Sequence, residues 1–286
     1  MLAKRRHKAV PTWCRFCFFM QWVNYIYKTD SLTKFIRSFF LPNTHYMALQ
    51  PWRTGKVIRI EDHTHNTKRF WIEVPELESF DFKAGQFVTL DLPIHEKPNK
   101  RWRSYSIASR PDGTNVFALL IVLAEHGLGT HYLFNEIKVG SELTFRGAQG
   151  VFVLHEPIVK PVFLICTGTG IAPFRSMATH INTHNIEHNN IYLIFGCRKK
   201  EDLLYYDELK ALQETLPGFH YLPCLSREEW NGHHHGYVHP VYEELCKDKP
   251  DASFFICGWK QMIDEARKRI ADMGYDKKAV HLELYG

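Results

Sequence analysis

A glycine-rich turn that follows an apolar run carries the clearest chemical signal in the sequence. Residues 161–166 (PVFLIC) form a continuous apolar run, which is typical of a buried parallel strand. The turn at 167–173 (TGTGIAP) comes next, and a helical pattern extends over 174–184. Glycines let backbone N–H groups approach a ligand, and a helix N-terminus favours an anion. The turn therefore predicts a dinucleotide pyrophosphate, although its spacing differs from the common G-x-G-x-x-G.

A second set of residues, Arg103, Tyr105 and Ser106, has the side chains that a flat, phosphorylated cofactor requires. The guanidinium offers several fixed donors suited to a pyrophosphate. Tyr105 lies two residues along a strand and thus on the same face, where its ring can stack on a heterocycle. Ser106 supplies a hydroxyl that can donate or accept at the heterocycle edge. The alternative is an exposed strand with a cross-strand aromatic residue.

A further glycine turn at 127–130 (GLGT) precedes a helical pattern over 131–136 and predicts a second phosphate contact. Thr130 can also act as the N-cap of that helix, which is the purely structural explanation. The apolar residues 120–122 (LIV) lie on an expected strand, from which backbone groups can contact an adenosine. They would look the same as ordinary core residues.

The elements that must position these residues fall into two regions. Between residues 54 and 155, short alternating or β-branched runs separated by turn residues predict an antiparallel β-barrel. The sequence predicts a polar hairpin loop at 63–68 within this region. The expected strands are 55–60, 69–74, 86–92, 104–108, 116–122 and 142–145.

From residue 156 onward, strand and helix patterns alternate. Repeated βα units predict an α/β domain with a parallel sheet and helices on both faces. Ligands bind at the carboxyl ends of the strands in such sheets, so we expect binding residues at 196–198, 226–227 and 257–258. The expected strands are 161–166, 191–195, 220–225 and 254–257, and the expected helices are 174–184, 203–215, 238–246 and 262–273.

The length and the charge distribution limit the class of protein. A chain of 286 residues with 45% hydrophobic and 23% charged residues suits two globular domains. Residues 1–46 hold eight of the 36 Lys and Arg residues but only one of the 31 acidic residues. Because the remaining charges nearly balance, a nucleic-acid-binding surface over the folded body is not expected.

The seven cysteines do not form a metal-binding or iron–sulfur pattern. Cys14 and Cys17 make one C-x2-C pair, without a second pair or histidines at zinc spacing. A C-x4-C-x2-C run of the plant ferredoxin type is absent from the sequence. Reduced thiols, and therefore a cytoplasmic location, are expected. Any iron–sulfur centre in an electron path would then belong to another protein.

The first 46 residues are a basic leader with an apolar segment at 16–27 (FCFFMQWVNYIY). This segment is too short to span a bilayer and is interrupted by Gln21 and Asn24. It lacks the small-residue cleavage site of a secretory signal. Three interpretations stay open: a membrane-surface segment, a targeting peptide, or sequence upstream of a native start at Met47.

Five motifs occur in a recognisable order: Arg103-x-Tyr105-Ser106, Gly127–Thr130, 168–173 (GTGIAP), Cys257-Gly258-x-x-x-Met262 and Glu283-x-Tyr285. In this order the chain resembles the ferredoxin–NADP reductase superfamily over residues 50–286. The resemblance implies FAD on the barrel, a nicotinamide dinucleotide on the α/β domain, and an enzyme that moves hydride between NADP(H) and FAD. It also implies exchange of single electrons with an external carrier such as ferredoxin or flavodoxin.

By matching motifs, the resemblance implies that Ser106 lies near flavin N5 and that Cys257 flanks nicotinamide C4. Glu283 and Tyr285 match the terminal Glu-x-Tyr of plant-type members, in which the Tyr covers the flavin. These four are the predicted catalytic residues. The predicted cofactor-binding residues are Arg103, Ser104, Tyr105, Ser106, Leu120, Ile121, Val122, Gly127, Leu128, Gly129, Thr130, Thr167, Gly168, Thr169, Gly170, Ala172, Pro173, Arg198, Ser226, Arg227, Tyr237, Cys257, Gly258 and Met262.

The matching motifs also assign parts of the cofactors. Arg103 would hold the FAD pyrophosphate, Tyr105 would stack on the isoalloxazine, and the turn at 127–130 would bind the phosphates. Three departures from the family pattern stand out. Gly286 extends one residue beyond the terminal Tyr, 146–150 (RGAQG) replaces a frequent Gly-Pro-x-Gly, and Val122 stands where plant-type members often carry Lys.

NADP is favoured over NAD by the pair Ser226-Arg227, which matches the family's 2′-phosphate-binding Ser-Arg. Tyr237 would stack on the adenine. His235 stands where plant-type members tend to have Lys, which weakens the positive charge at neutral pH, and Arg198 can compensate. NAD therefore stays open as the alternative.

The electron carrier is the least determined part of the prediction. Ferredoxin and flavodoxin are acidic, and five basic residues could form a docking patch for them: Lys97, Lys100, Arg101, Lys199 and Lys200. The alternatives are an NADH-dependent reductase component of an oxygenase and a non-catalytic flavin-binding scaffold. The leader could add contact with a membrane surface, and no nucleic-acid partner is expected.

The resulting domain organisation is a leader at 1–47, an FAD-binding barrel at 48–155 and an NADP-binding α/β domain at 156–286, in a monomer. The histidines 233–235 and His239 raise the hypothesis of a metal site, but a polar loop between βα units is favoured. No metal cofactor is therefore predicted.

Overall fold

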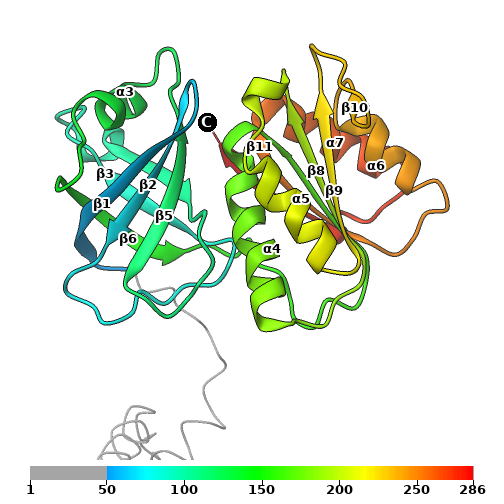
Figure 1. The fold of residues 1–286 in the computed structure, drawn as a ribbon, viewed down its shortest axis with the longest axis horizontal. Helices are drawn as coiled ribbons and strands as arrows, with labels where there is room; N and C mark the ends of the chain where they lie inside the picture. Colours follow the sequence, from blue (N-terminus) through cyan, green and yellow to red (C-terminus); the bar gives the residue numbers. More distant parts are fainter. Residues whose placement is uncertain (1–49, 286) are drawn as a thin grey trace, which may run out of the picture. The chain divides into compact units, whose positions relative to one another are not determined.

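The computed structural model describes residues 50–285 of the chain. The predictions made for the leader fall outside this range. The described residues form two domains, each built on a six-stranded sheet, within one compact unit (Figure 1). No helix between residues 50 and 285 is long and apolar enough to cross a membrane.

The first domain is the antiparallel barrel that the short alternating runs predict. Its strand order is β4-β3-β6-β1-β2-β5, and a bridge between Ile107 and Leu119 joins the two outer strands. Phe70, Phe117 and Phe145 fill the interior and are fully buried. The strands are β1 (Trp52–Thr64), β2 (Thr67–Glu73), β3 (Phe87–Asp91), β4 (Trp102–Ser106), β5 (Val116–Val122) and β6 (Glu142–Gln149). A short 3-10 helix, η1 (Pro98–Lys100), precedes β4, and helix α3 (Leu128–Asn135) follows β5.

The second domain has a parallel sheet with the order β10-β9-β8-β7-β11-β12. The strands are β7 (Val162–Thr167), β8 (Ile191–Cys197), β9 (Phe219–Leu225), β10 (His234–His235), β11 (Ser253–Trp259) and β12 (Val280–Tyr285). The α-helices are α4 (Ala172–His184), α5 (Tyr206–Thr215), α6 (His239–Leu245) and α7 (Lys260–Asp272). The short 3-10 helices are η2 (Gly168–Ile171), η3 (Lys200–Asp202) and η4 (Lys277–Ala279).

The apolar strands of this sheet are buried because helices cover both faces. Side chains of α4 and α5, such as Phe174 and Leu209, form one core against the sheet, and side chains of α6 and α7, such as Tyr242 and Ile270, form the other. Figure 1 shows these two helix pairs on opposite sides of the strands. The strand order reverses between β7 and β11, which is where open α/β sheets bind ligands.

The two domains are joined by the connecting chain segment and also by a shared apolar core. Ala108 and Leu120 of the barrel, with Phe152 of the connecting segment, belong to the same buried cluster as Phe174 and Met177 of α4. Such a continuous core holds domains together more firmly than a polar interface does.

Two predictions about the elements were wrong in extent. The hairpin predicted at 63–68 is present, but its loop is only two residues long, because β1 continues to Thr64 and β2 begins at Thr67. Thr67 is buried, and its hydroxyl donates to Asn66 Oδ1 at 3.1 Å, which satisfies this polar group. The helix expected from residue 203 begins at Tyr206, after Tyr205 adopts a left-handed conformation with φ of 56°.

Candidate functional site

The centre of the candidate site is the place where the glycine-rich turn meets the end of β11. A Cβ atom at Gly170 would lie 2.4 Å from the backbone oxygen of Cys257, and one at Gly258 would lie 2.5 Å from Thr167 Oγ1. Gly258 also has a φ of +141°, which L side chains rarely adopt. Only glycine allows the two segments to approach this closely.

The turn exposes backbone donors of the kind that bind phosphate. Gly168 has a φ of +54°, and η2 leads directly into α4 without a side-chain cap at either N-terminus. Pro173 occupies the first turn of α4, where its missing N–H costs no hydrogen bond. The remaining N–H groups and the helix dipole suit an anion. The turn that contains Thr167, Thr169, Gly170 and Ala172 therefore fits a dinucleotide pyrophosphate.

The C-terminal strand brings the predicted catalytic residues of the α/β domain together. β12 pairs with β11 in parallel and places Glu283 opposite Cys257, which in turn lies opposite Cys166 of β7. The Ser106 hydroxyl at the end of β4 donates a hydrogen bond to the Glu283 carboxyl group. Residues from both domains, Ser106, Cys257 and Glu283, thus converge at the switch point, the place where the strand order reverses between β7 and β11.

Burial dominates the electrostatics of Glu283. It raises the pKa of this carboxyl group to about 7, and the Ser106 hydroxyl only partly opposes the shift. The group can therefore gain or lose a proton near neutral pH. The backbone of Tyr285 pairs with Trp259, but the Tyr285 side chain lies outside the described part of the structure, as does Gly286.

On the barrel, Arg103 and the N-terminus of α3 form a second anion-binding arrangement. The Arg103 guanidinium donates to the backbone oxygens of Lys100 (3.1 Å) and Trp102 (2.8 Å), and no carboxylate within the described chain is close enough to neutralise it. A Cβ atom at Gly129 would lie 3.1 Å from Arg103 Cγ, so this glycine places the first turn of α3 directly against the arginine. The uncompensated charge and the uncapped helix fit the pyrophosphate of FAD.

The N-cap interpretation of Thr130 is wrong. Helix α3 begins at Leu128 with Gly127 as its N-cap, and Thr130 lies within the first turn. Its hydroxyl accepts from the N–H of Ala124 (3.1 Å) and donates to the carbonyl oxygen of Gly127 (2.9 Å). The hydroxyl therefore shapes the loop, and the role of Leu128 and Thr130 in phosphate binding stays a prediction.

The other predicted flavin contacts differ in exposure. The Tyr105 ring is half-buried, and this burial raises its pKa to about 12. Ser104 is exposed, with its hydroxyl 3.0 Å from that of Thr89. The side chains of Leu120 and Ile121 are buried in core, which leaves only their backbone for a ligand, and Val122 is half-buried.

A second cluster of predicted binding residues lies at the ends of β8 and β9. The backbone N–H of Ser226 donates to the Cys197 oxygen at 3.0 Å, and that of Arg227 donates to the Arg198 oxygen at 2.9 Å. Both arginine side chains are exposed and have no carboxylate within 4.0 Å in the described chain. Tyr237 is 73% exposed, so one face of its ring is accessible for stacking. These residues can bind a negatively charged group and a planar base.

Met262 does not share this position. It lies in the first turn of α7, and its side chain is buried in the core that α6 and α7 form against the sheet. Its assignment as a cofactor contact stays a prediction.

Sequence reasoning missed Trp259, which is 60% exposed at the end of β11, with its indole nitrogen facing Gly168. Its position directly after the motif Cys257-Gly258 was the one signal in the sequence that could have identified Trp259 as a site residue.

The histidine-rich segment has an aromatic rather than a metal-binding environment. His233 lies 4.1 Å from the Trp230 ring and donates to or accepts from Tyr206 Oη at 3.1 Å. His234 and His235 form β10 against β9. Between residues 50 and 285, no group of three or more His, Cys, Asp or Glu side chains is arranged to hold a metal ion.

The basic residues proposed for carrier docking are divided between the domains. Lys97, Lys100 and Arg101 lie around η1 of the barrel, where Arg101 is paired with Asp91. Lys199 and Lys200 lie at η3 of the α/β domain, where Lys200 covers the Trp230 ring at 4.7 Å.

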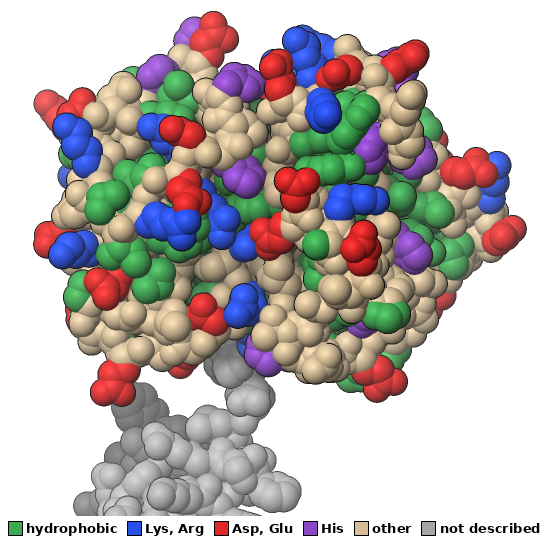
Figure 2. All heavy atoms as spheres, in the orientation of Figure 1, with side chains coloured by type: hydrophobic (Ala, Val, Ile, Leu, Met, Phe, Trp, Pro, Cys, Tyr) green, Lys and Arg blue, Asp and Glu red, His purple; other side chains and the backbone are tan. Residues whose placement is uncertain are grey.

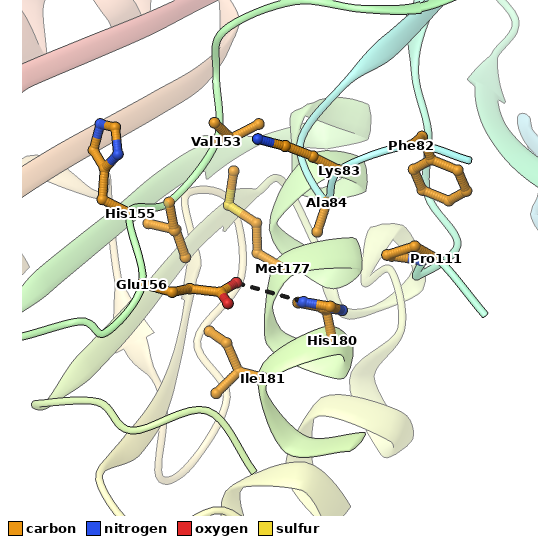
Figure 3. A pocket seen from close by; sticks show the side chains of 11 residues that line it. Phe82, Lys83, Ala84, Pro111, Val153, His155, Glu156, Met177, His180 and Ile181 are labelled. Carbon is orange, nitrogen blue, oxygen red and sulfur yellow. Dashed lines mark ion pairs between the residues drawn. The ribbon is translucent and has the colours of Figure 1, made fainter. Parts of the chain in front are cut away.

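A hollow of about 380 Å³ between the domains is separate from these residues. Figure 3 shows Lys83 on one side of it and Met177 on the other, with Glu156 paired to His180 at 3.4 Å. Burial lowers the pKa of His180, so its neutral form is favoured. None of the predicted site residues lines this hollow, and it is not the candidate site.

The two domains match separate protein families. Residues 54–154 match a family described as an oxidoreductase FAD-binding domain, and residues 164–268 match one described as an oxidoreductase NAD-binding domain. Ferredoxin–NADP reductase B of Sorangium cellulosum is 35% identical over 218 residues, which cover 73% of this chain and 87% of that protein. The 2-halobenzoate 1,2-dioxygenase electron transfer component of Burkholderia cepacia is 28% identical over 76% of this chain, but this match spans only 63% of its length.

Solved structures have the same fold. A ferredoxin NADP+ reductase from Neisseria gonorrhoeae with bound FAD and NADP has a TM-score of 0.68 and 26% identity, over 82% of this chain and 98% of that one. The cytochrome P450 reductase of Amycolatopsis has a TM-score of 0.73 and 26% identity, over 82% of this chain and 70% of that one. The two-domain architecture predicted from the sequence is confirmed, as are the FAD-binding and NAD(P)-binding domains.

Proposed function

Because the chain belongs to the ferredoxin–NADP reductase-like superfamily, we propose that it transfers hydride between NADP(H) and FAD and exchanges single electrons with an external carrier protein. The observation that carries this proposal is the meeting of Ser106, from the FAD-binding domain, with Cys257 and Glu283, from the NAD-binding domain. Hydride transfer requires the two bound rings to meet where the two domains meet.

The FAD-binding domain would hold its cofactor through Arg103, the α3 N-terminus and the Tyr105 ring. When bound, FAD supplies the ability to take up a hydride and to release its electrons one at a time. The protein's own contribution is orientation and charge. Arg103 and the first amides of α3 fix a pyrophosphate, and Tyr105 offers a flat surface for a ring.

At the switch point, the glycines would let a nicotinamide ring lie against the backbone of residues 167–170 and 257–258. Cys257 is held in register between β7 and β12, so its position beside the ring is set by three strands. The Glu283 carboxyl group, with its raised pKa, would hold a proton near neutral pH while one of its oxygens accepts the hydrogen bond from the Ser106 hydroxyl. Tyr285 would cover the flavin until the nicotinamide displaces it.

NADP is the proposed dinucleotide, because Arg198 and Arg227 are two uncompensated guanidinium groups beside Ser226. A 2′-phosphate would neutralise them, whereas the ribose hydroxyl of NAD would not. Tyr237 would stack on the adenine.

The carrier is proposed to be a ferredoxin, a flavodoxin or an oxygenase component. Ferredoxin–NADP reductase B supports the first of these, and the dioxygenase electron transfer components support the last. An NADH-dependent oxygenase reductase is therefore the second candidate function. We also propose domain boundaries at 48–155 and 156–286, a monomeric state and a cytoplasmic location.

The direct test is the absorption spectrum of the purified full chain. We expect a yellow protein whose flavin band bleaches within seconds when NADPH is added under anaerobic conditions, and more slowly with NADH. A faster reaction with NADH would favour the oxygenase-reductase candidate. A flavin band that bleaches with neither nucleotide would contradict both enzyme functions and favour a scaffold.

A further inference from the structure

Arg175 lies outside all of the cofactor motifs, yet it uses its whole guanidinium group in ordered contacts. It is the fourth residue of α4, five residues after Gly170, and its side chain is only 11% exposed. Its Nε donates to one oxygen of Glu208 at 3.0 Å, and its Nη2 lies 2.8 Å from the other. Its Nη1 donates to the backbone oxygen of Ala108 in the barrel at 2.6 Å. This one side chain therefore joins α4 to α5 and to the FAD-binding domain.

The barrel segment that Arg175 holds is directly attached to Ser106. Ala108 is two residues further along, and its neighbour Ser109 accepts a hydrogen bond from the Ser176 hydroxyl at 2.6 Å. Ser176 is fully buried. The opposite side of the segment is fixed to β5, because Ala108 N–H donates to the Ala118 oxygen and Ala118 N–H donates to Ser109 Oγ. The segment is thus fixed between β5 and α4.

A third connection passes through the ring of Tyr205. The Arg175 guanidinium lies 4.7 Å from the centre of this ring, and His63 of β1 lies 4.4 Å away, with its Nε2 accepting from the Tyr205 N–H at 2.9 Å. Arg69 of β2 also approaches the ring, at 5.4 Å. In Figure 2, Lys and Arg side chains gather over the barrel close to the α/β domain, with acidic groups among them. Arg175 itself is mostly buried and makes hydrogen bonds to both domains.

We propose that Arg175, with Ser176, is a positioning residue for hydride transfer: it holds the glycine-rich turn at a fixed distance from the strand that ends in Ser106. The inference rests on the proposed function, because the distance matters only if a nicotinamide and a flavin react there. The turn and Arg175 belong to one rigid piece, η2 followed by α4, and Ala108 continues directly from β4. A displacement of the helix N-terminus would therefore displace a nicotinamide bound at the turn relative to a flavin bound beside Ser106.

The chemistry of the contacts explains why lysine cannot replace this arginine. The planar guanidinium binds both oxygens of Glu208, reaches Ala108 with a third nitrogen and presents a flat face to Tyr205. An ammonium group keeps the charge but can make neither the two-point contact nor the stacked one. Loss of one such contact need not unfold the protein, because the apolar core that the domains share remains.

The test uses the FAD-loaded full chain with Arg175→Lys and Ser176→Ala, measured by anaerobic stopped-flow reduction with NADPH. Because a misplacement of about 1 Å can cost about 100-fold in rate, we expect the limiting rate of flavin bleaching to fall at least about tenfold in Arg175→Lys. The NADPH dissociation constant should change less than about twofold, since no predicted nucleotide-binding group is altered. Arg267→Lys, at an exposed position on α7, is the matched control and should match the wild type.

Amide hydrogen exchange provides a readout that does not depend on turnover. In both variants, the amides of residues 108–110 should exchange faster than in the wild type, while those of β8 and β9 should not. Glu208→Gln, which leaves the Ala108 contact in place, should have a smaller effect on rate and exchange. An unchanged limiting rate in folded Arg175→Lys would overturn the proposal, and so would an equal loss of rate and affinity, which indicates a ligand contact.

The outcomes also separate this inference from the proposed function. If the wild-type protein is not bleached by either nucleotide, the proposed function fails, and the positioning role for hydride transfer fails with it. If the wild type is bleached and the variants are bleached at the same limiting rate, only the positioning role fails. If Arg175→Lys does not fold, Ser176→Ala decides on the same two measurements.

Discussion

The two ends of the nucleotide-binding edge of the parallel sheet are built in different ways. The inner end consists of the turn 167–171, residues 257–259 and Glu283, and it is shaped by backbone segments that approach too closely for any side chain but that of glycine. The outer end consists of Arg198, Ser226, Arg227 and Tyr237, which are exposed or half-buried side chains on loops. Under the proposed function, the rigid inner end would position the reacting ring, and the exposed charged side chains of the outer end would recognise the rest of the nucleotide.

This difference predicts which substitutions should reduce the rate of hydride transfer and which should raise KM. A substitution at the inner end moves backbone and should reduce the rate of hydride transfer and the stability together. A substitution at the outer end removes a contact that is equally present before and during the reaction, so it should raise KM with little effect on kcat.

The largest effect should come from Gly170→Ala at the inner end. The new Cβ atom would lie 2.4 Å from the Cys257 oxygen, so β11 or the turn must shift. We expect a loss of about 3 kcal/mol in the free energy of unfolding, and flavin reduction slowed beyond tenfold. Chemical denaturation and stopped-flow bleaching are the measurements.

Gly232→Ala is the matched control for this change. Gly232 has a φ of +84°, but a Cβ atom there would meet nothing within 4 Å. It should lose only about 1 kcal/mol, from backbone strain, and keep the wild-type rate. Equal losses in the two variants would show that close approach at the switch point is not what makes Gly170 necessary.

The next largest effect should come from Arg227→Ala, which tests the outer end. Loss of one charge-assisted contact to a 2′-phosphate should raise KM for NADPH about 10- to 100-fold and leave kcat within about twofold. KM for NADH should hardly change, because NADH has no group for the arginine to bind. Steady-state kinetics with both nucleotides, alongside Arg267→Ala as an exposed control, decides this. An equal rise in both KM values would remove the basis for preferring NADP.

For the inner end, the positions of the strands could be predicted from the sequence far better than the contacts between them. The apolar run that became β7 and the residues of β5 were located to within one residue, because burial in a sheet leaves a local apolar pattern. The contact between Ser106 and Glu283 joins residues 177 positions apart, and no local pattern encodes it. Only the register of β12 on β11 brings Glu283 there, although the alternation of Val280, Leu282 and Leu284 was a signal for that strand.

Arg175 illustrates a second limit of the sequence. From the sequence alone, an arginine in the first half of a helix is predicted to face solvent, since most arginines are exposed. Its burial follows from the docking of α4 on the barrel, which depends on both domains at once. Likewise, β1 and β2 extend into the polar stretch at 63–68 because Thr64 and Thr67 pair across the turn, and the polar composition of the stretch does not reveal this pairing.

The smallest effect concerns Glu283, whose carboxyl group accepts from the Ser106 hydroxyl the hydrogen bond that connects the two domains at the inner end. Its pKa is raised from 4.5 to about 7 in the folded protein, so the fold favours the neutral carboxyl group. The stabilisation from this preference is fully present below pH 4.5, declines as the pH rises through about 7, and is lost above it. The shift sets an upper bound of about 3 kcal/mol on the change in the free energy of unfolding across this window.

Glu283→Gln should therefore flatten the dependence of stability on pH between 5 and 8, because the amide cannot ionise. Glu214→Gln, an exposed change on α5, should leave the wild-type slope. The glutamine keeps a partner for the Ser106 hydroxyl, so turnover should fall only several-fold, while its dependence on pH near 7 disappears. Thermal unfolding and steady-state rates across this pH range test both effects. If the slopes of Glu283→Gln and wild type coincide, the proton at the inner end is held by another group, and the contrast with the outer end is then one of shape alone.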